Sequence, residues 1–191
     1  MTATAERIAL RRIEPRPWKN GCGLTREIAL APADAMGEFD WRLSVAVVAR
    51  DAPFSAFPGV DRSIVLLEGT GMLLRVGAAL HRLERPFASL EFSGDEAVQA
   101  QLIEGATTDF NVMVRRGRWR AEVAELSPGT TMPADAGLLL CWHGGLQVHA
   151  PDGPAALPGQ HALLWRDGLP ALSCAVESPS TRALLVRLLA L

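Results

Sequence analysis

The sequence predicts an all-β protein built from two β-barrel-like lobes in one chain. Two observations support this fold class: one stretch of sequence occurs twice, and short apolar segments alternate with glycine and proline along most of the chain. A repeat at a fixed offset indicates that one supersecondary unit is used more than once. Many short strands separated by turns are typical of sandwiches and barrels.

The repeated stretch covers residues 64–92 and residues 138–166, which align without a gap. Five pairs of identical residues mark the alignment: Leu66 and Leu140, Gly71 and Gly145, Leu83 and Leu157, Ala88 and Ala162, and Leu90 and Leu164. Each copy has the pattern strand, glycine turn, strand, polar or Gly-Pro turn, strand. We therefore expect one β-unit used twice, with the function located in the mouth of a barrel.

Segments of four to nine residues with apolar or β-branched side chains define the expected strands. In the first part of the chain these are residues 8–13, 25–30, 41–49, 63–68, 72–76, 87–92, 98–103, 109–115 and 119–125. In the second part they are residues 138–142, 147–150, 161–166, 172–176 and 183–189. Residues 127–136 are poor in strand formers and provide the linker. The expected lobes are thus residues 1–126, with the ligand site, and residues 127–191, a degenerate copy, packed together as one compact unit.

The composition excludes several classes of function. Of 191 residues 49% are hydrophobic, and 19 Lys and Arg face 21 Asp and Glu, so the basic footprint of a nucleic-acid-binding protein is missing. Three cysteines without a CxxC pair indicate reduced thiols. The N-terminus has no apolar signal segment, and no apolar run approaches the ~20 residues of a membrane helix. We expect a cytoplasmic protein that binds neither nucleic acid nor membrane.

Residues 15–26 combine the most unusual residue types in the chain. Two glycines allow the backbone to approach a partner closely, and Lys19, the only lysine, and Arg26 could hold an anion. An ordinary turn with solvent-facing charges explains the same composition. The pattern does not fit a phosphate-binding GxxxxGK[ST] loop.

Two further positions have alternative interpretations. On the strand at 41–49, Arg42 and Ser44 share one face, which lines a pocket if it points inward and is ordinary surface if it points outward. Glu68 ends the apolar segment IVLL before a glycine, where a carboxylate is a rim residue or the buried partner of an inward arginine.

Metal binding and nucleophilic catalysis have weak support. His143, His149 and His161 lack the HxH spacing of a metal-binding barrel and are better explained as satisfied polar residues. No GxSxG motif is present, and Cys22 between two glycines is treated as a small filler residue. We therefore assign no catalytic residue, no metal ligand and no cofactor.

Three strings in the same order resemble the HutD family, which includes the Ves proteins. They are PWKNGCGLTREIA at 17–29, FDWRLSVAVVARDAPFSAFPGVDRSIVLLEGTGM at 39–72 and DFNVMVRRG at 109–117. The resemblance covers residues 13–191 and is strongest before Gly117. Cys22 departs from it, because the family usually has a third glycine there. The resemblance implies a bicupin, two cupin-like lobes in one chain, from a cytoplasmic bacterial protein linked to histidine utilisation.

The resemblance also implies a small anionic ligand, such as N-formylglutamate, bound in a metabolic-control role. The expected site contains cationic, amide, apolar and acidic side chains: Trp18, Lys19, Asn20, Arg26, Arg42, Phe57, Arg62, Glu68 and Asn111. The cations would neutralise one or two carboxylates, the two asparagines would bond a formyl or amide group, and the aromatic rings would form the apolar wall.

Two alternatives remain open at this stage. The first is a small cupin hydrolase or isomerase that acts on an amino-acid derivative with Glu68 as acid or base. The second is an interaction protein with a vestigial pocket. Sheets of this kind often pair, which is compatible with a homodimer under each interpretation.

Overall fold

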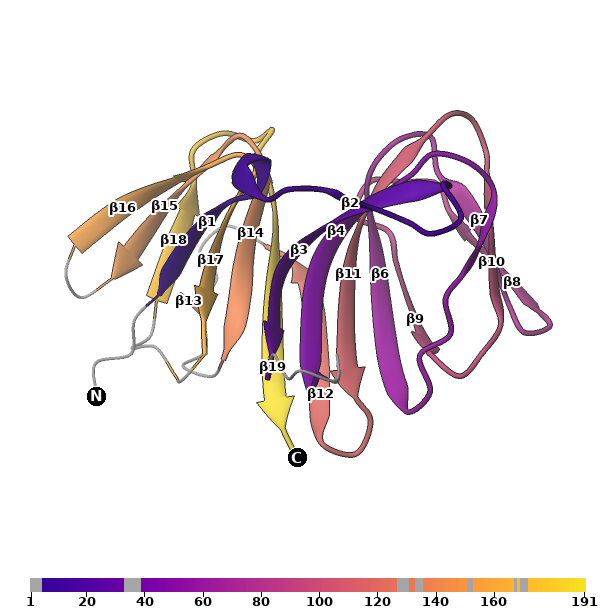
Figure 1. Cartoon of the computed structure of the whole chain (residues 1–191). Helices are drawn as coiled ribbons and strands as arrows, with labels where there is room; N and C mark the ends of the chain where they lie inside the picture. The colour runs from indigo at the N-terminus through magenta and orange to yellow at the C-terminus, as the bar shows by residue number, and fades with distance from the viewer. Residues whose placement is uncertain are drawn as a thin grey trace. The chain divides into compact units, whose positions relative to one another are not determined.

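The structure is a computed structural model of the chain, and it describes residues 5–32, 39–126, 131–132, 136–150, 153–166, 168 and 172–191 (Figure 1). Over these residues the chain forms nineteen β-strands and one 3-10 turn, η1 (Leu10–Arg12). The prediction of an all-β protein is confirmed. No helix in the described part of the chain is long and apolar enough to cross a membrane.

The contacts within the chain divide it into two compact units. The first, here the central unit, is Ile13–Arg120 with Leu191, and the second, here the terminal unit, is Met1–Arg12 with Ala121–Ala190. The expected single boundary at 126/127 differs from this division in two ways. The terminal unit already begins at Ala121, and it also includes the N-terminal segment up to Arg12. The physical reason is strand pairing: β1 (Glu6–Ala9) pairs with β17 (His161–Trp165) and so belongs to the terminal unit.

The central unit consists of two sheets. The larger has the order β2 (Arg16–Pro17), β3 (Gly23–Ala31), β4 (Trp41–Val48), β11 (Thr107–Arg115), β6 (Val60–Glu68) and β9 (Ser89–Ser93). The smaller has the order β5 (Ala52–Phe54), β10 (Val98–Leu102), β7 (Met72–Val76) and β8 (Ala79–Leu83). All the pairings are antiparallel.

The terminal unit repeats this arrangement. Its larger sheet has the order β1, β17, β14 (Gly137–His143), β19 (Arg182–Ala190) and β12 (Trp119–Glu125). Its smaller sheet has the order β13 (Thr131–Met132), β18 (Leu172–Val176), β15 (Gly145–Ala150) and β16 (Gly153–Pro158). The order β4-β11-β6-β9 in one unit thus corresponds to β12-β19-β14-β17 in the other, and β5-β10-β7-β8 to β13-β18-β15-β16.

The structure places the sequence repeat on four consecutive strands of each unit, β6 to β9 and β14 to β17. The pairing is conserved at the predicted offset, because Ile64 pairs with Leu90 and Leu138 pairs with Leu164. Each copy has one strand more than expected, since β8 and β16 form hairpins with β7 and β15. The inward face differs: Ile64 points into its unit, whereas Leu139 rather than Leu138 belongs to the interior cluster of the terminal unit.

An apolar cluster fills one end of the space between the two sheets of the central unit. Its buried members come from both sheets and are Val48, Ile64, Leu66, Met72, Leu74, Leu83, Val98 and Ala100. Burial of each larger side chain stabilises the fold by about 1.5–3 kcal/mol. Farther along β4, β6 and β11 the side chains on the same face become polar, so the cluster ends where the cavity described below begins.

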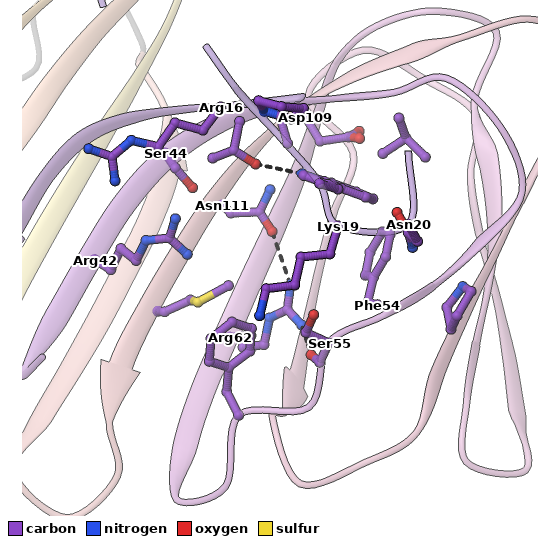
Figure 2. Close-up of a pocket in the computed structure, with 18 residues that line it drawn as sticks. Arg16, Lys19, Asn20, Arg42, Ser44, Phe54, Ser55, Arg62, Asp109 and Asn111 are labelled. Atoms are coloured by element: carbon purple, nitrogen blue, oxygen red, sulfur yellow. Dashed lines mark hydrogen bonds between the residues drawn. The ribbon is translucent and has the colours of Figure 1, made fainter. Parts of the chain in front are cut away.

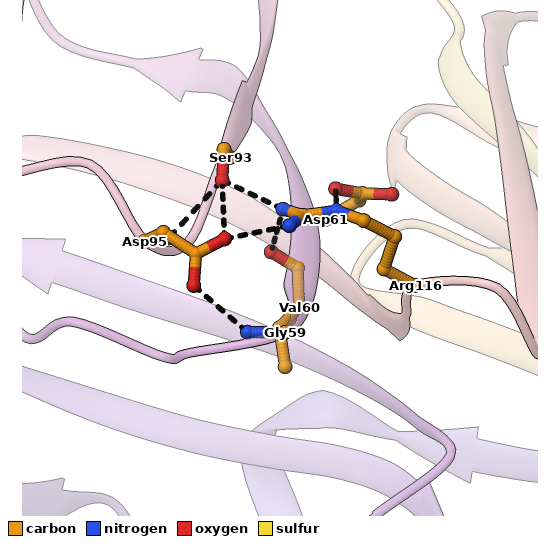
Figure 3. A network of polar contacts seen from close by, with 6 residues as sticks. All are labelled: Gly59, Val60, Asp61, Ser93, Asp95 and Arg116. Atoms are coloured by element: carbon orange, nitrogen blue, oxygen red, sulfur yellow. Dashed lines mark hydrogen bonds and ion pairs between the residues drawn. The ribbon is translucent and has the colours of Figure 1, made fainter.

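An arginine ties together the ends of three segments of the central unit (Figure 3). Arg116, which follows β11, donates to Asp61 Oδ1 at 2.7 Å, to Asp95 Oδ2 at 2.6 Å and to Ser93 Oγ at 2.6 Å. Asp95 also accepts a hydrogen bond of 3.0 Å from the Gly59 amide through Oδ1. The network fixes β6 and β9 at the end of the sheet that lies away from the apolar cluster.

Asp95→Asn is expected to lower the urea midpoint of unfolding at pH 7, because an amide cannot form the ion pair with Arg116. Hydrogen bonds from Arg116, and then from Gly59 and Ser93, lower the pKa of Asp95 from 3.8 to about 2. The stabilisation is therefore present above the ordinary pKa and is lost as the pH falls toward 2. The difference between variant and parent should shrink over that interval, as followed by tryptophan fluorescence. A difference that stays constant from pH 7 to pH 3, or that also occurs in the exposed control Glu91→Gln, contradicts this role.

Candidate functional site

A cavity of about 560 Å³ opens into the central unit at the polar end of the large sheet (Figure 2). The β-strands supply one wall, with β4 contributing Arg42, Ser44, Ala46 and Val48 and β11 contributing Asp109, Asn111 and Met113. The remaining described lining comes from Thr25, Arg62, residues 16–20 and the segment with Pro53, Phe54, Ser55 and Phe57. A volume of this size suits a small metabolite.

Strand register explains why these polar side chains converge. Asn111 pairs with Ser44 on one side and with Ile64 on the other, and Met113 pairs with Arg42 and Arg62. Paired residues in antiparallel strands point to the same face of the sheet. The polar face of β4 therefore points into the cavity, which settles the orientation that the sequence leaves open.

Arg62 is the most unusual residue of the cavity, because its side chain is charged and only 6% exposed. Its guanidinium donates to Ser55 O at 3.2 Å and to Asn111 Oδ1 at 3.3 Å, while Nε has no hydrogen-bond partner among the described residues. Three phenylalanine rings surround it, with the Cζ atom 4.9, 5.4 and 5.6 Å from the centroids of Phe92, Phe57 and Phe54. The aromatic faces stabilise the cation but do not neutralise it.

Burial, and then the charge of Arg42, lower the pKa of Arg62 to about 10. The guanidinium therefore remains charged at neutral pH. Within the described residues no carboxylate forms an ion pair with it. An uncompensated buried charge costs on the order of several kcal/mol, so this site favours the entry of an anion.

Arg42 is already paired. Its Nε lies 2.8 Å from Glu27 Oε2, and both side chains are about one quarter exposed or less. Glu27 reaches it because β3 pairs with β4 and places Glu27 opposite Ser44. Arg42 keeps further N–H groups for a ligand, but its charge is partly compensated by Glu27.

The loop at the cavity mouth has a fixed conformation. Trp18 Nε1 donates to Thr25 Oγ1 at 2.7 Å, and its backbone amide donates to Gly23 O at 2.9 Å. A Cβ at Gly23 would lie 2.4 Å from Val47 O and 3.0 Å from the Trp18 indole, so only glycine fits there. Gly21 has φ 69°, which glycine adopts without strain. The loop thereby places Trp18, Lys19 and Asn20 in the cavity lining, and Figure 2 shows the Lys19 side chain extended toward Arg62 and Asn111.

Asp109 lies in the cavity wall with no exposed surface. Its Oδ2 accepts a hydrogen bond of 3.1 Å from Thr107 Oγ1, while Oδ1 has no partner among the described residues. Burial raises the pKa of Asp109 from 3.8 to about 7, and the bond from Thr107 opposes this shift. The carboxyl group therefore titrates in the physiological range.

The structure brings seven of the nine predicted site residues to the cavity: Trp18, Lys19, Asn20, Arg42, Phe57, Arg62 and Asn111. The other two lie elsewhere. Arg26 pairs with Val45 and so points to the opposite face of the sheet from Thr25 and Glu27. Glu68 is the last residue of β6, beyond the apolar end of the strand, and does not line the cavity. The carboxylate that pairs with Arg42 is Glu27 instead.

Sequence reasoning also missed residues of the site. Asp109 and Asn111 are two apart in a strand, and this spacing alone puts both on one face. Ser44 shares the face of Arg42, as expected from sequence, and lines the cavity with it. Arg16 and Phe54 carry no comparable signal, because their positions depend on how the flanking loops fold over the sheet.

The interior of the terminal unit is apolar at the corresponding positions. In order along the matching strand pair, Arg62, Asp109 and Asn111 correspond to Gly137, Ala183 and Leu185. A Cβ at Gly137 would lie 3.0 Å from the Trp165 indole, so that ring occupies the space beside it. The cationic site is thus a property of the central unit.

Within the described residues no three His, Cys, Asp or Glu side chains are arranged to hold a metal ion. His161 Nδ1 lies 3.0 Å from Gly159 O, which accounts for one of the three histidines considered above. Burial raises the pKa of the Cys141 thiol to about 11 and also raises that of Cys174, so neither is suited to act as a nucleophile.

Comparison with known proteins agrees with the resemblance in the sequence. A model of the HutD family matches residues 11–184. Protein Ves of Citrobacter koseri is 38% identical over 168 residues, covering 85% of this chain and 84% of that protein. The structure of HutD from Pseudomonas fluorescens is similar with a TM-score of 0.85 at 26% identity, over 98% of this chain and 100% of that chain.

A more distant similarity supports the fold class. A cupin 2 conserved barrel domain protein from Leptotrichia buccalis has a TM-score of 0.60 at 10% identity, over 100% of this chain and 98% of that chain. At this identity the similarity extends to the fold only. The cupin-like architecture of the chain is therefore shown independently of close sequence relatives.

Asp109→Asn is expected to stabilise the protein at high pH. Because the folded pKa lies above the unfolded one, the parent loses stability as the pH rises from about 4 to about 7, and the amide removes this loss. The gain in the free energy of unfolding over the parent should be about 2–4 kcal/mol larger at pH 8 than at pH 4. Urea denaturation at both pH values measures it. If the variant and the parent change in parallel with pH, Asp109 is not a buried group of raised pKa.

Proposed function

The chain belongs to the HutD family, and we propose that it binds a small anionic metabolite of histidine degradation, such as N-formylglutamate, in a metabolic-control role. The site is the cavity of the central unit, and the proposal places the protein in the cytoplasm. It assigns no metal and no cofactor to this binding.

A single observation supports this function most strongly: Arg62 is buried, charged and without a carboxylate partner in the described part of the chain. Natural structures pair buried charges, and a ligand carboxylate would complete the pair here. The Nε–H of Arg62 has no partner among the described residues, and a guanidinium can bind a carboxylate through two parallel hydrogen bonds.

The charges around the cavity suit a ligand with one or two negative charges. Arg16, Lys19 and Arg42 line the cavity in addition to Arg62. Glu27 compensates Arg42, and Asp109 is in a surrounding that favours its neutral form. The net charge of the lining is therefore positive at neutral pH.

The neutral side chains suit the rest of such a ligand. Asn20, Ser44 and Asn111 offer hydrogen bonds to a formyl or amide group, and Trp18, Phe54 and Phe57 offer apolar surface to the carbon chain. Trp18 and Phe54 pack edge to face with centroids 6.0 Å apart, which keeps this wall rigid before a ligand arrives.

The two alternatives receive less support. A hydrolase or isomerase that uses Glu68 would need this carboxylate in the cavity, where it does not lie. An interaction protein with a vestigial pocket would have a filled interior, whereas here a cavity of about 560 Å³ is lined by polar side chains. A turnover assay on intermediates of histidine degradation distinguishes a binder from an enzyme that uses another residue.

Arg62→Met is expected to weaken binding of N-formyl-L-glutamate by about 2–5 kcal/mol, because the ligand carboxylate loses its buried partner. The thermal stability of the unliganded variant should be equal to or higher than that of the parent, since a buried charge is removed. Lys19→Ala and Arg42→Ala should also weaken binding. Titration calorimetry at pH 6 measures each affinity.

The matched control is Arg75→Met, which removes an exposed arginine from β7, outside the cavity. It should bind as the parent does. An Arg62→Met variant that is folded and binds with unchanged affinity removes this site assignment, as does a parent protein that binds no small carboxylate.

A further inference from the structure

Asp109 is the only acid among the described residues that line the cavity. Its side chain is fully buried, and one of its two oxygens, Oδ1, has no hydrogen-bond partner in the described part of the chain. A buried polar atom without a partner is rare in folded proteins, and at a ligand site it marks a place where the ligand supplies the missing bond. The proposed function leaves this atom unused.

The surroundings of Asp109 do not compensate a negative charge. Its neighbours across the sheet are Ala46 on β4 and Leu66 on β6, both apolar. Among the described residues its one hydrogen-bond partner is Thr107, a neutral hydroxyl. An ionised carboxylate at this position would therefore be buried without a counter-charge.

The charged groups that face the cavity come from every element around Asp109. Arg42 on β4, Arg62 on β6, Arg16 on β2 and Lys19 in the loop before β3 line the cavity. Glu27 on β3 is not part of the lining, but it lies on the same face of the sheet and pairs with Arg42. None of them forms a hydrogen bond or ion pair with Asp109 in the described residues, and Arg42 is held by Glu27. The described lining contains no histidine, and burial raises the pKa of Asp109 to about 7.

An anion bound to Arg62 would increase the electrostatic cost of an ionised Asp109. Arg62 Nη2 contacts Asn111, which is two residues from Asp109 on the same face of β11. Two residues along a strand span about 6–7 Å. Two negative charges in the same small cavity repel each other appreciably, and the neutral acid is the form that can coexist with the ligand.

We propose that Asp109 binds the ligand as a neutral carboxylic acid, which donates a hydrogen bond from its free oxygen to an oxygen atom of the anion held by Arg62. The proton comes from solvent, so that capture of the anion above neutral pH takes up one proton. This inference rests on the proposed anion-binding function and extends it. Arg62 holds the carboxylate of the ligand, and Asp109 binds a second group of the same ligand.

The geometry defines a ligand class. One end is a carboxylate for Arg62, and farther along the cavity, at Asp109, lies a carbonyl or carboxylate oxygen that accepts the hydrogen bond. Dicarboxylates and N-acyl amino acids of four to six carbons satisfy this requirement.

Titration calorimetry of the full chain with N-formyl-L-glutamate and with glutarate tests the inference. Each ligand is titrated at pH 6 and pH 8 in two buffers with different ionisation enthalpies, which gives the number of protons exchanged on binding. We expect uptake of about 0.9 proton at pH 8 and about 0.1 at pH 6, and an affinity about tenfold weaker at pH 8 than at pH 6. Both carboxyl groups of N-formyl-L-glutamate stay ionised in this range, so the protons exchanged with that ligand belong to the protein. The second carboxyl of glutarate still titrates at pH 6, so the proton count for glutarate is taken at pH 8.

Two variants identify the group that is responsible. Asp109→Asn has a permanent N–H donor, and we expect no proton uptake and the same affinity at both pH values. Glu104→Gln makes the same chemical change at an exposed carboxylate outside the cavity and should behave as the parent does.

The outcomes separate the two proposals. Binding without proton uptake, binding with proton release, or uptake that persists in Asp109→Asn overturns the role of Asp109 and leaves anion binding in place. No binding of either ligand at either pH overturns the proposed function and this inference with it. Uptake in the parent and in Glu104→Gln that is lost in Asp109→Asn establishes the proton-coupled site.

Discussion

A buried guanidinium without an internal counter-charge is the constraint on which the site depends. Arg62 is held by a backbone carbonyl, an amide oxygen and three aromatic rings, each of which orients or stabilises the cation without neutralising it. The fold therefore keeps one positive charge at the cavity wall in a defined orientation. The carboxylate of the proposed ligand would meet a binding group that needs no reorganisation, which would favour affinity.

The large sheet of the central unit carries Arg62, and its inward face changes from apolar to polar along the strands. At one end, residues such as Ile64 and Leu66 close the space between the two sheets, and at the other end the same face bears Arg62, Ser44 and Asn111. The apolar end supplies the stability that the polar end lacks. In the terminal unit the positions that correspond to Arg62, Asp109 and Asn111 are taken by Gly137, Ala183 and Leu185, so that unit has the architecture without these polar side chains.

Much of the fold and of the candidate site is predictable from the sequence, and the wrong or missing site residues have a common cause. The all-β class and the repeat follow from local pattern, and the alternation in β4 puts Arg42 on one face. Which face points inward depends on pairing between strands, which sequence does not reveal. For that reason the sequence predicts Arg26 in the site, although the next residue, Glu27, is the one on the cavity face. Sequence does not single out Asp109, although it shares a face with Asn111, because its chemistry depends on burial.

The most direct test of the central claim is the ¹⁵N resonance of Arg62 Nε, assigned by comparison with Arg62→Lys, during titration of the protein with N-formyl-L-glutamate. If the guanidinium is the anion receptor, its Nε–H signal shifts downfield in proportion to ligand occupancy and becomes protected from exchange with water. A protein that becomes saturated with ligand while this signal stays unchanged would show that the anion binds elsewhere.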